Sequence, residues 1–276
     1  MLGLLGCKVC LLIGSYRWQI LMKAHNIEVS FAHSLALNYL GLFFNNFMLS
    51  LTGGDIVKAY YASKLEHTKR ATSATIVFLD RVIGFTALVF MGGISVLAAA
   101  GKEGAAIEFL VVIAGVMGCM LLGLVVFNRK VARALGRIII FKKLKPSLRK
   151  VYDAVYYYKK SKKTLLLAFL ISIALWCFLI LVNVVVGNGL GIDRPPAYYF
   201  TYIPVIILIS SAPVSVRGWG IREYFYGKFF GFEYGPTLSI IFALLEVAWS
   251  LVGGILFALQ FPMKKWNRPG MEKTME

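Results

Sequence analysis

The stretch that decides the fold class, residues 164–192, reads TLLLAFLISIALWCFLILVNVVVGNGLGI and contains no charged side chain. An α-helix needs about 20 apolar residues to cross a lipid bilayer. Residues 82–101, 109–127 and 197–216 are equally free of charge. Because 59% of the 276 residues are hydrophobic and only 16% are charged, the chain holds more apolar surface than a soluble domain buries. The sequence therefore predicts an all-α polytopic membrane protein.

The net charge of +17 is distributed between the apolar segments and does not cover a compact domain, so nucleic acid is not an expected partner. Many of the cations lie in residues 129–163, where Asp153 is the only acid. Short loops this basic stay in the cytoplasm. We therefore expect a multi-pass protein of the cytoplasmic membrane, with the basic loop 129–163 and the tail 264–276 in the cytoplasm.

Apolar segments can be drawn over residues 2–21, 29–51, 71–101, 105–128, 164–192, 197–216 and 235–263. If all of them crossed the bilayer, the basic tail would lie on the wrong side. The segment 197–216 is interrupted by Pro204 and Pro213, and the polar segment 29–51 leads into a Gly53-Gly54 pair. We expect these two segments to form re-entrant hairpins, which leaves about five spanning helices.

This topology predicts one transmembrane domain over residues 1–263 that contains an inverted repeat. The first repeat covers about residues 1–101 and the second about residues 164–263, with a linking helix over 105–128. Each hairpin is followed by a segment with an acidic residue inside it. Matched interrupted segments in two halves of a membrane protein indicate a transport site.

Asp80 and Glu246 are the acidic residues placed deep in these segments. A charge at the bilayer centre costs about 2.5 to 3.5 kcal/mol on insertion scales, so it pairs with another group or faces a polar cavity. Arg81 adjoins Asp80, but neighbours on a helix do not face each other. We therefore expect Asp80 and Arg81 to have their partners on other segments.

Two glycine-containing turns, one in residues 52–58 and one in residues 215–223, complete the candidate site, because glycines let backbone amides approach a ligand. A helix that starts near Ile221 would favour an anion at its N-terminus. We expect Arg217 and Arg222 to hold a phosphate as a fork, assisted by Lys58 or Arg81. An alternative interpretation is that the arginines reach lipid headgroups and that the buried acids form structural ion pairs. No metal-ligand spacing or catalytic residue is identified. The candidate substrate-binding residues are Gly53, Gly54, Asp55, Lys58, Asp80, Arg81, Arg217, Gly218, Gly220, Arg222, Glu223 and Glu246.

Four short motifs, in this order, resemble the lysylphosphatidylglycerol synthase transmembrane (flippase-like) family. They are Arg17-Trp18-x-x-Leu21, the stretch from Asn45-Asn46 to Gly53-Gly54-Asp55-x-x-Lys58, Leu79-Asp80-Arg81-x-x-Gly84, and Gly218-x-Gly220-x-Arg222-Glu223. In that family, the membrane domain of multiple peptide resistance factor is implicated in moving aminoacylated phosphatidylglycerol between leaflets. The chain resembles that membrane domain alone, and it departs from the family pattern at Lys58, where arginine is frequent.

The resemblance implies a lipid transporter for an anionic or aminoacylated phospholipid or a polyprenyl-phosphate-linked lipid, without a cofactor. Two alternatives stay open: the membrane part of a phosphatidylglycerol lysyltransferase or other lipid-carrier transferase, and a scaffolding subunit for such an enzyme. An enzymatic role is not favoured, because the soluble catalytic domain of the family is not recognised. A separate lipid-modifying enzyme and a second copy of the chain are the protein partners considered.

Overall fold

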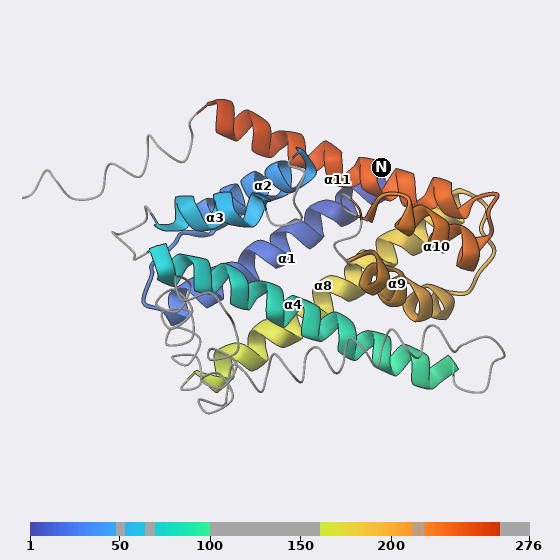
Figure 1. Cartoon of the computed structure of the whole chain (residues 1–276), viewed down its shortest axis with the longest axis horizontal. Coiled ribbons are helices and arrows are strands. Elements are labelled where there is room, and N and C mark those ends of the chain that lie inside the picture. The colour runs from blue at the N-terminus through green and yellow to red at the C-terminus, as the bar shows by residue number, and fades with distance from the viewer. Residues whose placement is uncertain (48–52, 64–69, 100–160, 212–214, 216–217, 260–276) are drawn as a thin grey trace, which may run out of the picture.

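A computed structural model describes residues 1–47, 53–63, 70–99, 161–211, 215 and 218–259, and these residues form helices without any strand (Figure 1). The expected all-α fold is thus confirmed for the part of the chain described. The helices are α1 (Leu2–Ala24), α2 (Phe31–Phe47), α3 (Gly53–Ser63), α4 (Arg70–Ala99), α8 (Lys162–Gly189), α9 (Pro196–Ser210), α10 (Ile221–Phe230) and α11 (Gly235–Ala258).

Three of the described helices are long and apolar enough to cross a membrane: Thr72–Ile94 within α4, Lys162–Gly189 and Gly235–Ala258. Helix α1 has 23 residues but includes Lys8, Arg17 and Lys23, which lower its hydropathy. The predicted linking helix 105–128, most of the basic loop 129–163 and the tail 264–276 lie outside the described residues. The structure therefore supports a helical membrane protein with three candidate spans among the described residues, and the predicted total of about five stays a prediction.

Four short helices form two packed pairs, α2 with α3 and α9 with α10. They contain 17, 11, 15 and 10 residues, fewer than the roughly 20 needed to cross a bilayer. Proline begins α9, where its missing N–H group costs no helical hydrogen bond. Gly218 and Gly220 lie before α10 with φ angles of +74° and +83°, a left-handed conformation that glycine adopts readily.

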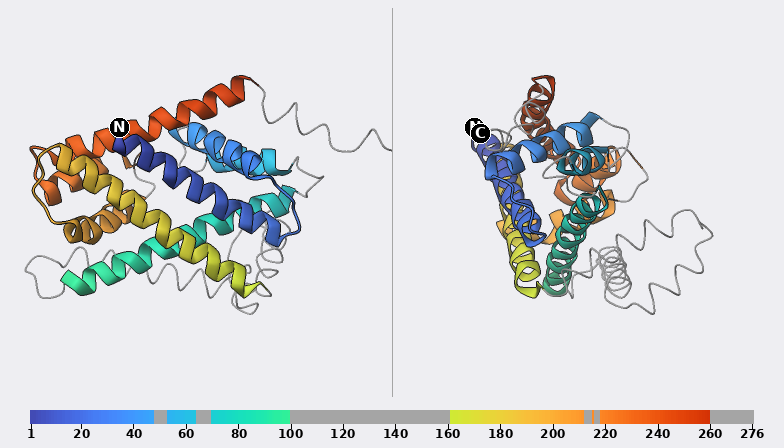
Figure 2. Two further views of the ribbon diagram at one scale, coloured as in Figure 1. Left: turned by 180° about the vertical axis from the view of Figure 1, so that it is seen from behind. Right: turned by 90° about the vertical axis from the view of Figure 1, so that its left-hand side faces the viewer.

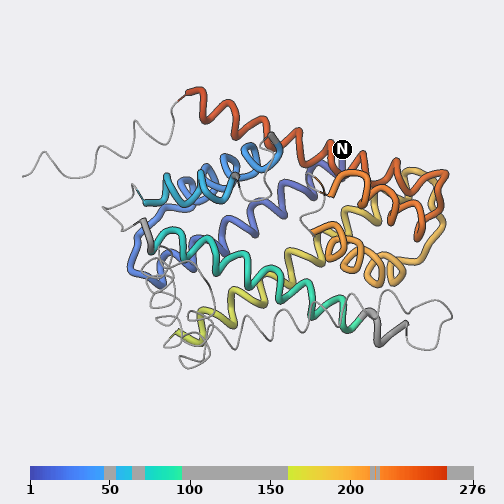
Figure 3. Tube along the Cα trace, viewed as in Figure 1, coloured from blue at the N-terminus to red at the C-terminus, as the bar shows by residue number. Residues whose placement is uncertain are grey.

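Among the described helices the same order of elements occurs twice: a long helix, a pair of short helices and another long helix. Helices α1–α4 form the first half and α8–α11 form the second half. Following the colours of Figures 1 and 3, α1 and α11 run from right to left, whereas α4 and α8 run from left to right. Each helix of the first half has a counterpart in the second: α1 corresponds to α8, α2 to α9, α3 to α10 and α4 to α11. The packed pairs correspond in the same way, because α1–α2 matches α8–α9, α3–α4 matches α10–α11, and α2–α11 matches α9–α4. The two halves are joined mainly where α1 packs along α8, as the rear view in Figure 2 also shows.

Each half has its own apolar core. In the first half Trp18, Leu40 and Ile76 are buried together, and in the second half Tyr199 and Leu238 are buried. Leucine and isoleucine side chains on the outer faces of α8 and α11 are exposed, as expected for surfaces that contact lipid instead of water. The exposed residues include Leu166, Leu170, Leu251 and Ile255.

Candidate functional site

A cavity of about 400 Å³ lies between the two halves. Its walls come from α1, α2, α3 and α4 of the first half and from α8, α9 and α11 of the second. Most of the lining is apolar, but six charged residues also line it, namely Arg17, Asp55, Lys58, Asp80, Arg81 and Glu246. Polar groups that converge in an otherwise apolar pocket are typical of a ligand site.

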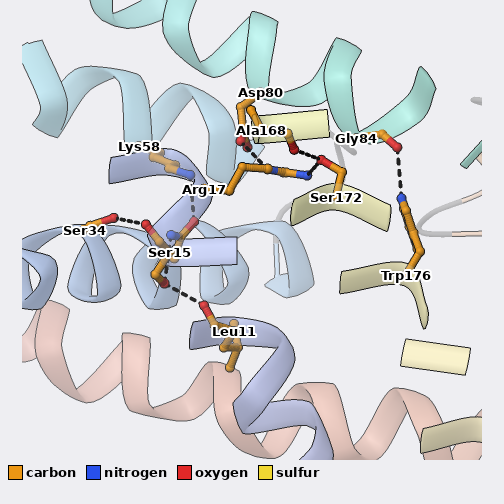
Figure 4. A network of polar contacts seen from close by, with 11 residues as sticks. Leu11, Ser15, Arg17, Ser34, Lys58, Asp80, Gly84, Ala168, Ser172 and Trp176 are labelled. Atoms are coloured by element: carbon orange, nitrogen blue, oxygen red, sulfur yellow. Dashed lines mark hydrogen bonds and ion pairs between the residues drawn. The ribbon is translucent and has the colours of Figure 1, made fainter. Parts of the chain in front are cut away.

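Arg17 and Asp80 form an ion pair deep in this cavity, with the Arg17 Nε atom 2.8 Å from Asp80 Oδ1 (Figure 4). Their side chains are only 11% and 12% exposed. Arg17 Nη1 also donates a hydrogen bond of 2.8 Å to the Ser172 hydroxyl on α8. One guanidinium therefore joins α1, α4 and α8, and with them both halves of the molecule.

Arg81 and Asp55 form the second ion pair, in which two parallel hydrogen bonds of 2.6 and 3.0 Å join the guanidinium to both carboxylate oxygens. This fork arrangement is the strong geometry for an arginine and a carboxylate. The Arg81 side chain is 56% exposed, so this pair is accessible, unlike the pair of Arg17 with Asp80. The expectation that Asp80 and Arg81 have partners on other segments is confirmed.

Lys58 is the third cation that lines the cavity, and the residue is only 5% exposed. Its ammonium nitrogen donates a hydrogen bond of 2.7 Å to Asn38 Oδ1 and lies 4.5 Å from the centre of the Trp18 ring. Asn38 is held in turn by a 3.0 Å hydrogen bond to the Ser15 hydroxyl. Residues of α1 and α2 thus fix the position of a lysine that belongs to α3 (Figure 4).

The second glycine-containing turn forms a separate polar cluster at the start of α10. The Gly220 N–H group donates a hydrogen bond of 2.6 Å to the Glu223 carboxylate. Arg222 donates to the Ser239 hydroxyl, which donates to Glu223, with distances of 2.9 Å each. This helix terminus, which the sequence suggested as an anion site, is therefore capped by the protein's own Glu223.

The structure does not bring all sequence candidates together. Asp55, Lys58, Asp80, Arg81 and Glu246 line the one cavity. Gly218, Gly220, Arg222 and Glu223 are not among its lining residues, and Arg217 lies outside the described residues.

The Gly53-Gly54 pair has a packing role at the start of α3. The Gly54 N–H group donates a hydrogen bond of 2.9 Å to Asn45 Oδ1. A side chain at Gly54 would collide with the Gly41 backbone. Gly54 therefore allows α3 to approach α2, and it is not among the residues that line the cavity.

Comparison with known proteins decides the family. Residues 1–258 match the family model described as the lysylphosphatidylglycerol synthase TM region. The chain belongs to this family. The resemblance seen in the four motifs is thereby confirmed.

The chain is also similar to the UPF0104 membrane protein MJ1595 of Methanocaldococcus jannaschii. The two are 32% identical over 77 residues, which is 28% of this chain and 23% of the relative. The chain thus aligns with under a quarter of that relative's length. No solved structure matches the chain.

Four residues in or next to the cavity were absent from the sequence candidates: Arg17, Trp18, Asn38 and Ser172. Arg17 lies towards the end of the apolar segment 2–21, and its guanidinium is buried against Asp80. Its position in the Arg17-Trp18-x-x-Leu21 motif was the available signal. Ser172 lies in a continuous apolar stretch, where sequence offers no sign of its partner.

Proposed function

We propose that this protein moves a lipid between membrane leaflets by admitting the lipid headgroup into the cavity between its two halves. The observation that supports this proposal is a cavity lined by six charged residues inside a helical bundle whose outer faces expose leucine and isoleucine. The acyl chains would stay in the bilayer while the headgroup passes. The candidates are an anionic or aminoacylated phospholipid and a polyprenyl-phosphate-linked lipid.

We further propose that the pairs α2–α3 and α9–α10 are re-entrant hairpins related as an inverted repeat. Their short lengths, the opposite directions of α1 and α8, and the exchange of contacts between halves support this arrangement. Backbone that leaves the helical conformation inside a membrane is tolerated where protein or a polar cavity satisfies it. Asn45, near the end of α2, supplies such a partner to the Gly54 amide at the start of α3.

The charges of the cavity would lower the cost of bringing a polar headgroup into the bilayer. Arg81 and Asp55 are suited to first contact, because Arg81 is half exposed while its partner is mostly buried. A headgroup phosphate would pair with Arg81 and a headgroup amine with Asp55, so a headgroup that carries both groups would match both partners of the opened pair. Orientation would follow the positive-inside rule, with the loop 129–163 and the tail 264–276 in the cytoplasm.

Reconstitution tests this function directly. The purified protein is placed in liposomes that contain a fluorescent phospholipid, and a membrane-impermeant quencher reports exchange between leaflets. Wild-type protein should raise the exchange rate above that of protein-free liposomes, and Asp55→Asn should lower it about tenfold because a charged hydrogen-bond acceptor is lost. Asp193→Asn, in the exposed turn after α8, is the matched control and should exchange at the wild-type rate.

Absence of leaflet exchange with folded wild-type protein would reject the transport function. Mass spectrometry of the same lipids separates transport from catalysis, because a transferase would change the lipid mass when an aminoacyl or glycosyl donor is added. A scaffolding subunit would produce neither exchange nor a mass change.

A further inference from the structure

The cavity contains one cation that the described residues leave without an acidic partner. Arg17 pairs with Asp80, and Arg81 pairs with Asp55. Lys58 has no carboxylate oxygen within ion-pair distance in the described part of the chain, and its hydrogen bond goes to the neutral amide of Asn38. The first half therefore lines the cavity with one more positive than negative charge.

The surroundings of Lys58 fix its ammonium group in place without neutralising it. An ammonium group has three N–H donors. Asn38 accepts one of them, and the face of Trp18 attracts the cation by a cation–π interaction. Among the described residues Asn38 is the hydrogen-bond acceptor recorded for this ammonium group, and Lys58 lines the cavity, so its other donors can reach a ligand there.

A buried cation of this kind binds an oxyanion more strongly than a cation in water, because the local dielectric constant is low. With Glu246 of the second half, the cavity is lined by three positive and three negative side chains, but among the described ion pairs Arg17 and Arg81 are matched by Asp80 and Asp55 whereas Lys58 is not. A phosphodiester carries one negative charge and would match Lys58 in the same way. We infer that Lys58 is the phosphate-binding group of the cavity and takes the phosphodiester oxyanion of a lipid headgroup. This inference rests on the proposed function, which brings lipid headgroups to the cavity, and it moves the phosphate contact from the Arg217–Arg222 turn to α3.

Binding of a water-soluble phospholipid tests the assignment. The full chain in an uncharged detergent is titrated with dihexanoyl phosphatidylglycerol in a calorimeter, and inorganic phosphate and dihexanoyl glycerol are titrated separately. Lys58→Met should weaken binding of the phospholipid on the order of 10- to 100-fold, because a charged hydrogen-bond donor is lost. Lys58→Arg should retain binding because it keeps the positive charge.

Lys8→Met is the matched control. Lys8 also lies over a tryptophan ring, 5.6 Å from the centre of Trp249, but it is exposed and does not line the cavity. This variant should bind the phospholipid as the wild type does. Equal affinity of Lys58→Met and the wild type would overturn the assignment.

A second variant keeps the test decisive if Lys58→Met does not fold. Asn38→Asp changes little in shape and supplies Lys58 with its own carboxylate at the observed hydrogen bond. It should fold and bind the phospholipid more weakly than the wild type. Unchanged binding by folded Asn38→Asp would overturn the assignment.

The three titrated compounds distinguish a lipid phosphate from free phosphate. Together with the leaflet-exchange assay, they also distinguish the role of Lys58 from the proposed transport. Inorganic phosphate that binds as tightly as the phospholipid would overturn a lipid-headgroup site in favour of a free-phosphate site. Dihexanoyl glycerol, which lacks phosphate, should not bind in a Lys58-dependent way. Lys58-dependent binding without leaflet exchange would reject only the proposed transport, whereas exchange without Lys58-dependent binding would reject only the role of Lys58.

Discussion

At the scale of single residues, the ion pair of Arg17 with Asp80 shows how a buried acid is tolerated in this chain. Each side chain is nearly inaccessible, and the pair is extended by the hydrogen bond from Arg17 to Ser172. Replacement of both partners in such a pair by apolar groups is frequently harmless, but removal of one partner leaves an uncompensated buried charge.

Asp80→Asn should therefore lower the free energy of unfolding by about 3 kcal/mol, because the Arg17 guanidinium loses its counter-charge. Unfolding in a titration with sodium dodecyl sulfate, followed by circular dichroism, measures the change. Asp193→Asn should change the unfolding free energy little, since Asp193 is exposed. A stability of Asp80→Asn equal to that of the wild type would contradict a structural role for the pair.

The close contact of α3 with α2 depends on Gly54. A methyl group at this position would collide with the Gly41 backbone, which cannot move as a flexible side chain can. Gly54→Ala should therefore destabilise the protein by about 1 to 3 kcal/mol, the usual cost of overpacking. Gly189→Ala is the control, because nothing lies within 4 Å of the added atom, and thermal unfolding of both variants in detergent gives the comparison. A similar melting temperature for both would show that α3 can shift without cost.

Part of the candidate site could be predicted from the sequence. A charge inside an apolar segment needs a partner, which predicted that Asp80 and Arg81 are paired with other segments. It could not identify Arg17, because that contact joins residues far apart in the chain and depends on how α1 packs against α4 and α8. For the same reason it could not predict that Trp18 and Asn38 surround Lys58. The Glu223 cap of α10 is local, because Glu223 lies three residues after Gly220, and that spacing was its available signal.

At the scale of elements, glycine, proline and polar residues predicted the interruptions near Gly53 and Gly218. The described helices do end and begin there, with α3 starting at Gly53 and α10 at Ile221. The exact span count was less predictable, because α1 combines apolar residues with three cations. Whether these short pairs return to the side from which they start remains a prediction.

Labelling of single introduced cysteines tests that topology, in a variant whose four native cysteines are replaced by alanine. Asp193→Cys and Glu233→Cys, which flank the α9–α10 pair, should react with an impermeant reagent on the outer face. Glu28→Cys and Ser63→Cys, which flank α2–α3, should react on the cytoplasmic face only after the membrane is permeabilised. If the two cysteines of one pair react on opposite faces of the membrane, the segment between them crosses the membrane.

At the scale of the whole molecule, α2 of the first half packs on α11 of the second, where the rings of Phe44 and Phe257 lie with centroids 5.1 Å apart. If a headgroup passes between the halves, they must move relative to each other. A disulfide between Phe44→Cys and Phe257→Cys should therefore slow leaflet exchange by about tenfold or more, and a reductant should restore it. The liposome assay before and after reduction measures both rates.

A matched disulfide between Tyr198→Cys and Phe230→Cys joins two helices inside the α9–α10 pair, where the ring centroids are 5.5 Å apart. It should leave exchange close to the rate of its reduced form. Equal exchange with the Phe44–Phe257 disulfide closed or open would show that the halves do not separate along α2 and α11.

The contacts of Lys58 also have a consequence for how the chain is made. Trp18 and Asn38 precede Lys58 in the sequence, so both are already synthesised when the lysine leaves the ribosome. The counter-charges of Arg17 and Asp55 follow at positions 80 and 81, before any residue of the second half is translated. A nascent chain of the first half can therefore complete its charge pairs while the ribosome is still attached, whereas the hydrogen bond from Arg17 to Ser172 has to wait for the second half.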